Sequence, residues 1–253
     1  MKMHFLPGGR LRMRRGVYYP GAAREETVEL PVICTLLKHD QGNVLFDTGC
    51  SPDAANDAEA RWGGVARAMV PIYRPEDTLI HHLGETGLVP DDIDVVICSH
   101  FHPDHCGCNE HFKRATIICH RDELAAAKEQ GVAMGYLPQE WDHAQRGFDT
   151  FEGQRDLFGD GRIVLLPVAG HTPGMIAALV GLDESGDYLL ASDAVAVEAN
   201  LVEGYAPKNS WDLEKATAAI AQIKAIGERG AKIIYGHDDA QWQQLRKGAE
   251  HYA

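Results

Sequence analysis

The apolar pattern of this chain begins with two short runs typical of paired strands. In "PVICTLLKHDQGNVLFDTG", residues 32–38 and 43–47 are rich in aliphatic side chains, and a polar stretch containing Gly42 separates them. Apolar runs of this length joined by a short polar turn predict a β-hairpin. Asp47 then lies at the end of the second strand.

The middle of the chain alternates helical and strand patterns. Leu79, Ile80 and Leu83 fall on one helical face, and a buried strand is expected next over residues 95–98. "ATIICHRDELAAAKEQG" repeats strand and helix in the other order. Residues 134–150 carry mixed signals, which we interpret as a loop with some helix.

The last third of the chain returns to strands. "GRIVLLPVAGHTPG" predicts a strand that ends near His171, and a hairpin over 175–182 and 188–191 follows. "NSWDLEKATAAIAQIKAIGERG" has a helical stripe with Ser210 as its expected N-cap, and the strand "AKIIY" leads to His237. This order of elements predicts an α/β fold of two sheets packed face to face with helices outside.

Nothing in the sequence marks a domain boundary. There is no internal repeat, no low-complexity tract and no Pro/Gly/Ser-rich linker. A chain of 253 residues is long enough to bury a substantial core. We therefore expect residues 1–253 to form a single domain.

Composition narrows the range of partners. The net charge of −13 argues against nucleic acid and against an anionic membrane surface. The first apolar run breaks at Pro7 and Gly8, so neither a signal peptide nor a membrane span is predicted. The six cysteines do not form the framework of a small secreted scaffold, which indicates reduced thiols. We expect a cytoplasmic protein that acts on a small molecule, and a homodimer is left open.

The strongest chemical signal is "CSHFHPDHCG", which follows the strand expected over 95–98. In an extended or tightly turned segment, His100 and His102 point the same way and can reach one cation. Asp104 and His105 can then address a second cation beside it. This motif therefore predicts a metal site.

Three later residues can complete a pair of sites. His171 can join the first set, His237 the second, and the carboxylate of Asp193 can bridge both. Two cations ~3.5–4 Å apart can hold a hydroxide and polarise a carbonyl, which indicates metal-assisted hydrolysis. The predicted metal ligands are His100, His102, Asp104, His105, His171, Asp193 and His237.

Ordinary structural roles explain the other candidates better. His171 or His237 alone would more often be a hydrogen-bonded residue at a strand end, and only the motif reverses that interpretation. The other eight histidines lack such spacing. Cys106 and Cys108 could be thiolate ligands, but the motif already supplies enough donors, so we expect them to be packing residues.

"SHFHPDH" matches the H-x-H-x-D-H signature of the metallo-β-lactamase superfamily, and "AGHTPG", "ASDA" and "YGHD" resemble its later ligand motifs. "LFDTG" resembles its Asp-Thr-Gly loop, where Asp47 would support a ligand rather than bind metal. "ARWGGVARAMVPIY", "ICHRDE" and "FGDG" are most similar to the N-acyl homoserine lactonase group, with its γ-butyrolactone hydrolases and 4-pyridoxolactonases. The resemblance implies an αβ/βα four-layer sandwich, two Zn²⁺ ions and lactone ring opening by a metal-bound hydroxide.

Two positions depart from that group. Its members usually carry a tyrosine three residues after the bridging aspartate, where this chain has Ala196. They also often read H-x-P-G-H, where this chain ends the motif with Met175. Tyr205, from the following loop, is a candidate for the missing hydroxyl, and Asp104 is the second candidate catalytic residue.

A zinc-dependent lactonase is therefore the leading hypothesis, and two alternatives stay open. A glyoxalase-II-like thioesterase would use the same ligand set on a thioester. A ligand-binding protein with little turnover would keep the metals without the tyrosine. β-Lactamase chemistry is disfavoured by the bridging carboxylate of Asp193, and flavodiiron chemistry by His102, where that motif has glutamate.

Overall fold

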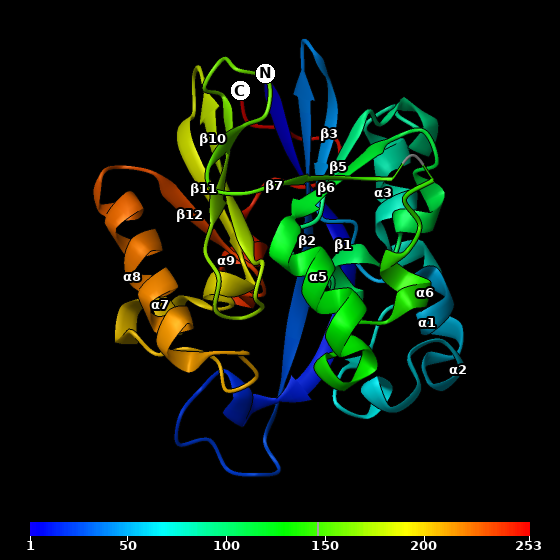
Figure 1. Ribbon diagram of the computed structural model, residues 1–253, viewed down its shortest axis with the longest axis vertical. Coiled ribbons are helices and arrows are strands. Elements are labelled where there is room, and N and C mark those ends of the chain that lie inside the picture. Colours follow the sequence, from blue (N-terminus) through cyan, green and yellow to red (C-terminus); the bar gives the residue numbers. More distant parts are fainter. Residues whose placement is uncertain (146) are drawn as a thin grey trace.

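The strands form two sheets that pack against each other in the computed structural model, which describes residues 1–145 and 147–253 (Figure 1). The first sheet has the order β4-β1-β2-β3-β5-β6-β7, made of β1 (Lys2–Arg14), β2 (Thr27–His39), β3 (Gly42–Phe46), β4 (Val70–Pro71), β5 (Val95–Ile97), β6 (Thr116–His120) and β7 (Phe148–Phe151). The second has the order β12-β11-β10-β9-β8, made of β8 (Arg155–Asp156), β9 (Ile163–Pro167), β10 (Ile176–Leu182), β11 (Gly186–Ser192) and β12 (Lys232–Tyr235).

Helices flank the two sheets. Figure 1 shows α8 beside the second sheet and α3 and α6 on the opposite side of the molecule, so the layers run helix, sheet, sheet, helix. The helices are α1 (Pro52–Asn56), α2 (Ala58–Trp62), α3 (Leu79–Glu85), α4 (Pro103–Cys106), α5 (Arg121–Gln130), α6 (Pro138–Trp141), α7 (Glu198–Glu203), α8 (Leu213–Glu228) and α9 (Asp239–Gln244). The α/β four-layer order predicted from the sequence is confirmed.

A continuous apolar core joins the two sheets. Phe5 and Phe46 of the first sheet belong to the same buried cluster as Ile163, Ile176 and Leu190 of the second. Burying one such side chain contributes roughly 1.5–3 kcal/mol, so this layer is a main source of cohesion between the sheets. The sheets are thereby held in a fixed relation, which the site between their ends requires.

The strands that lead to the site are buried. β5 pairs in parallel with β3 and with β6. A strand that is covered on both faces has a continuous run of apolar residues, and the run "VVI" of β5 therefore predicts a buried strand. The carboxyl ends of β3 and β5 lie at the same edge, where the backbone N–H of Asp47 donates to the carbonyl of Ile97 over 2.8 Å.

The sequence pattern did not predict β1, because Pro7, Gly8 and Gly9 interrupt its apolar run. In the structure these residues lie where the pairing with β2 shifts register, between Pro7 and Arg10. Gly9 has a φ of 116°, and a Cβ on Gly8 would lie 2.7 Å from the Sγ of Cys34. Glycine therefore permits both the irregular backbone and the close contact.

Two local predictions are wrong. Helix α8 begins after Asp212 rather than Ser210, because the Asp212 side chain accepts from the backbone N–H groups of Glu214 and Lys215. The range predicted as loop with some helix contains α6 but also the start of β7, whose sequence "FDTF" carries little apolar signal. Residue 146 of that range lies outside the described residues.

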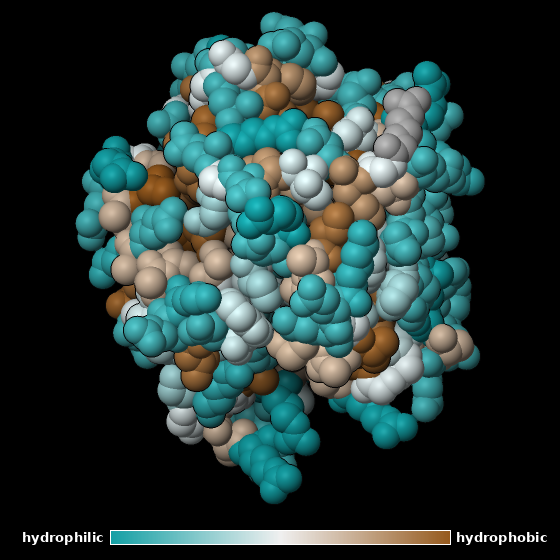
Figure 2. All heavy atoms as spheres, viewed as in Figure 1, coloured by the Kyte–Doolittle hydropathy of each residue, from teal (hydrophilic) through white to brown (hydrophobic). Residues whose placement is uncertain are grey.

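The surface is largely polar. Figure 2 shows hydrophilic side chains over most of one face, with smaller apolar patches between them. Among the helices that the structure describes, none combines the length and apolar character needed to cross a membrane. All six cysteines are buried and carry free thiols.

Candidate metal centre

The seven predicted ligands meet between the ends of the two sheets. Their donor atoms fall into three overlapping groups, and within each group the atoms lie within 4.8 Å of one another. The groups are His100, His102 and His171; Asp104, His105 and His237; and His100, His105 and Asp193. Residues far apart in the sequence are thus brought into one buried cluster.

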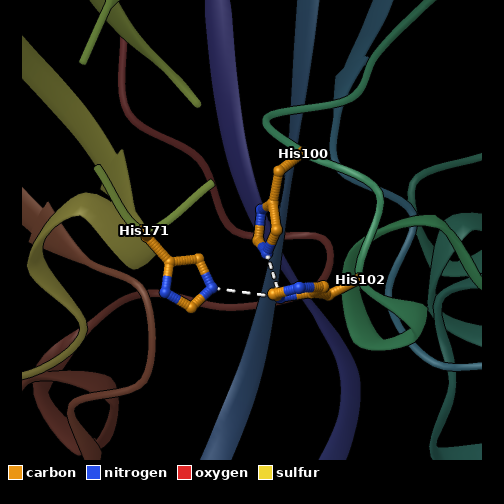
Figure 3. A group of neighbouring side chains, drawn as sticks. All are labelled: His100, His102 and His171. Atoms are coloured by element: carbon orange, nitrogen blue, oxygen red, sulfur yellow. Dashed lines mark hydrogen bonds between the residues drawn. The ribbon is translucent and has the colours of Figure 1, made fainter. Parts of the chain in front are cut away.

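Three histidine rings converge in the first group (Figure 3). The Nδ1 atom of His102 lies 3.1 Å from Nε2 of His100 and 3.0 Å from Nε2 of His171. His100 and His102 follow β5 of the first sheet, whereas His171 follows β9 of the second. The outer Nε2 of His102 donates to the carbonyl of Met134 over 3.0 Å, so its inner nitrogen keeps a lone pair for a cation.

The second group combines two histidines with the carboxylate of Asp104, and the carboxylate of Asp193 lies against it. Nε2 of His237 lies 2.9 Å from Oδ1 of Asp193 and 3.5 Å from Oδ2 of Asp104. Nε2 of His105 lies 3.3 Å and 3.5 Å from the same two oxygens. The Nδ1–H of His237 donates to the carbonyl of Pro31 over 2.8 Å, which turns its other nitrogen toward the carboxylates.

Asp193 connects the two groups. Its Oδ1 faces His237 and His105, while its Oδ2 lies 3.4 Å from Nε2 of His171. Each carboxylate oxygen therefore faces a different group, as a bridging ligand would.

Burial and charge prepare these groups for a cation. Burial lowers the pKa of His100 and of His102, and it lowers the pKa of His171 to about 3, so these rings are neutral at pH 7. Burial also opposes protonation of His105, but the carboxylates of Asp104 and Asp193 raise its pKa. The second group thus attracts positive charge, whether a proton or a metal.

The cluster also contains unsatisfied polar atoms. Within the described residues, Oδ1 of Asp193 and Nε2 of His105 are buried without a hydrogen-bond partner. Leaving such atoms unpaired is costly, and divalent cations satisfy nitrogen and oxygen donors of this kind. The donor set therefore fits a pair of metal ions.

Asp47 supports the cluster from behind, as the motif resemblance implied. Its carboxylate accepts from the backbone N–H and the hydroxyl of Ser99 over 2.7 Å and 2.8 Å, and it lies 2.9 Å from Nδ1 of His105. Asp47 has a φ of 62°, and nearby Ser192 has a φ of 46°. Positive φ is uncommon for such residues, and its occurrence at both places indicates local strain held by the surrounding packing.

Glu123, which the sequence analysis missed, ties two ligand loops together. It is fully buried at the start of α5, and it accepts from the backbone N–H groups of Phe101 and Gly174, each over 3.0 Å. Burial raises its pKa to about 7. In the sequence Glu123 resembles an ordinary acidic residue in the first turn of a helix, so no local signal distinguishes it.

Close packing at Gly174 provides a test of this connection. A Cβ at this position would lie 2.1 Å from the backbone N of Glu123, so Gly174→Ala should lower the free energy of unfolding by roughly 1–3 kcal/mol. Gly84→Ala in α3 is the matched control, because nothing lies within 4 Å of its added Cβ. Denaturant unfolding compares the two variants. Equal stability of both would contradict the predicted contact.

Cys106 and Cys108 behave as packing residues. The thiol of Cys106 donates to the carbonyl of His102, and that of Cys108 donates to the carbonyl of Cys50, each over 3.2 Å. Burial raises the pKa of both thiols, which opposes thiolate formation. Met175 is also fully buried, in an apolar cluster with Val168.

Tyr205 is not brought into either donor group. Its hydroxyl donates to the backbone carbonyl of Tyr18 over 2.7 Å. Ala196 is fully buried beside the cluster, and its carbonyl accepts from the backbone N–H of His237 over 2.7 Å.

A cleft of about 380 Å³ opens next to the first group. His102 and His171 lie in its wall, and most of the remaining wall is apolar. Its apolar side chains include Met13, Val65, Met69, Val132, Met134 and Trp211. The cleft thus offers an apolar surface beside the metal donors.

Comparisons with known proteins agree with this geometry. The sequence model of the metallo-beta-lactamase superfamily matches residues 27–237 of this chain. The N-acyl homoserine lactonase AiiA of Bacillus thuringiensis subsp. kurstaki is 30% identical over 250 residues, covering 97% of this chain and 96% of the relative. The N-acyl homoserine lactonase AttM of Azorhizobium caulinodans is 26% identical over 259 residues, covering 100% of this chain and 98% of the relative.

Solved structures show the same fold. An N-acyl homoserine lactone hydrolase with the product N-hexanoyl-L-homoserine bound at its catalytic metal center superimposes with a TM-score of 0.88 at 28% identity, covering 99% of this chain and 98% of that one. A quorum-quenching N-acyl homoserine lactone hydrolase gives a TM-score of 0.86 at 28% identity, with the same coverage. The chain belongs to the metallo-β-lactamase superfamily, as its motifs predicted.

Proposed function

We propose that this protein is a metal-dependent hydrolase that opens lactone rings of the N-acyl homoserine lactone or γ-butyrolactone type. The observation that carries the proposal is the convergence of seven donors in two groups that Asp193 connects. The names of the relatives and the product bound in a solved relative support the substrate class.

The metal ligands in this proposal are the seven predicted residues. His100, His102 and His171 would hold one cation, Asp104, His105 and His237 would hold the other, and Asp193 would be a ligand to both. Mixed nitrogen and oxygen donors of this kind suit Zn²⁺, so we propose two zinc ions. When bound, such a pair polarises a carbonyl oxygen and lowers the pKa of water to near neutrality.

The protein supplies order and exclusion of water. Asp47, Pro31 and Met134 accept from the outer nitrogens of His105, His237 and His102, and so they fix the ring orientations. The ligand residues other than His102 are buried, which strengthens every charge interaction among them.

The apolar cleft supports a substrate with a hydrocarbon chain. Val132, Met134 and Trp211 are exposed at 59%, 37% and 37%, and they line the cleft beside His102 and His171. Apolar side chains left in water at a cleft gain free energy when an apolar ligand covers them. An N-acyl chain in this cleft places the attached lactone ring near the metal donors, and its hydrolysis would act as quorum quenching.

The proposal also covers the domain organisation and the cellular compartment of the protein. The core that joins both sheets runs from Met3 to Trp242, which supports one domain over residues 1–253. The six free thiols support a reducing, cytoplasmic compartment. The homodimer stays a prediction.

Parallel assays on γ-butyrolactone, an N-acyl homoserine lactone and S-lactoylglutathione test the function. We expect turnover of a lactone, loss of that turnover on removing metal with a chelator, and recovery on adding Zn²⁺. Preference for S-lactoylglutathione would identify a thioesterase instead. Tight binding of a lactone without turnover by the metal-loaded protein would identify a ligand-binding protein.

A further inference from the structure

Tyr18 and Ala196 belong to one buried apolar cluster. Tyr18 lies between β1 and β2, it is 2% exposed, and its side chain belongs to the same apolar cluster as Ala196 and Val197. The cluster also contains Met13 and Leu137. A bulky phenol from the amino-terminal part of the chain thus lies in the same cluster as the small residue three positions after Asp193.

The hydroxyl of Tyr18 contacts a residue of the cleft wall. It donates to Sδ of Met13 over 3.2 Å. Met13 lines the cleft that contains His102 and His171. Burial raises the pKa of Tyr18, and the charges of Asp193 and Asp104 raise it further, so the phenol stays protonated at pH 7.

The partner of this hydroxyl is weak. A thioether is a poor hydrogen-bond acceptor, so the phenol can turn to a stronger acceptor that enters the cleft. An oxygen atom that gains negative charge during a reaction is such an acceptor.

Hydrogen bonds from a later segment of the chain hold the backbone of Tyr18. Its carbonyl accepts from the hydroxyl of Tyr205 over 2.7 Å and from Nδ2 of Asn200 over 3.3 Å. The carbonyl of Val17 accepts from the backbone N–H of Lys208 over 3.0 Å. These contacts fix the position of Tyr18, and they suit Tyr205 to a positioning role.

Resting on the proposed lactonase function, we propose that Tyr18 is a catalytic residue whose hydroxyl protonates the departing ring oxygen. A water oxygen bonds to the carbonyl carbon, the bond between that carbon and the ring oxygen breaks, and its electron pair stays on the ring oxygen. The Tyr18 proton moves to this oxygen and forms the product hydroxyl. A proton from the attacking water restores the phenol.

Two substrates with different leaving groups test this role. Tyr18→Phe removes one oxygen atom and keeps the buried ring. On an N-acyl homoserine lactone, kcat should fall by roughly 10²–10⁴-fold, the usual loss when a general acid is removed. On the matching N-acyl homocysteine thiolactone the fall should be much smaller, because a thiolate departs without a proton.

Tyr19→Phe is the matched control, since the Tyr19 ring stacks on the Arg15 guanidinium, 4.2 Å from ring centroid to Cζ. It should change neither substrate's kcat, and all variants should retain the metal content of the wild type. Equal losses of Tyr18→Phe on both substrates, or no loss on either, would overturn the assignment of Tyr18. Wild-type protein that opens neither ring would instead overturn the proposed function, on which this role depends.

Discussion

Replacing Asp193 by alanine should remove metal from both sites together. Its two carboxylate oxygens face different donor groups, so one substitution takes a ligand from each. Catalytic efficiency should fall by more than the roughly 10–100-fold that follows from losing an outer hydrogen-bond partner of a ligand. Elemental analysis of the purified variant, beside lactone kinetics, measures both effects.

His237→Ala provides the contrast. His237 contacts Asp104 and Asp193 in the second group, so its loss should empty that site and leave the three-histidine site loaded. The model of a shared bridge predicts a lower metal content for Asp193→Ala than for His237→Ala. Retention of both ions by Asp193→Ala would refute it.

The second large effect is expected at Asp47. Asp47→Asn keeps the shape of the side chain but replaces one accepting oxygen with a donating NH₂ group. Oδ2 of Asp47 faces Nδ1 of His105, and Oδ1 accepts from the backbone N–H of Ser99, so either orientation of the amide breaks a buried hydrogen bond. Metal affinity should fall roughly 10–100-fold.

A chelator competition titration measures this loss directly. Asp53→Asn is the control, because Asp53 is an exposed carboxylate in α1 with the same change of charge. Its metal affinity should match that of the wild type. If Asp47→Asn behaves like Asp53→Asn, the hydrogen bond to His105 does not govern metal binding.

The sequence predicted those parts of the fold whose signal is local. The parallel strand β5 and the hairpin of β10 and β11 are short apolar runs bounded by turn residues, so their side chains alone indicate them. Strand β1 failed this criterion because Pro7 and two glycines break its pattern. Its long pairing with β2 depends on tertiary packing, which outweighs local preference.

The same distinction applies to the site. The spacing of His100, His102, Asp104 and His105 is local, so the motif predicted one half of the cluster directly. Glu123 acts through a contact with Gly174, 51 positions away, and Tyr18 joins the cluster that contains Ala196, 178 positions away. A distant contact leaves no periodic signal in a single sequence, and only the folded chain reveals it.

The division of the ligands between two sheets links the lifetime of the protein to its metal supply. His100 and His102 approach His171 only when the sheets are packed, so an unfolded chain offers no comparable site. A cation that binds only the folded state adds about 2.7 kcal/mol of stability at a free concentration of 100 times its dissociation constant. Metal starvation should therefore increase the unfolded fraction and expose the chain to proteolysis, so that scarcity of metal reduces both the activity and the abundance of the protein.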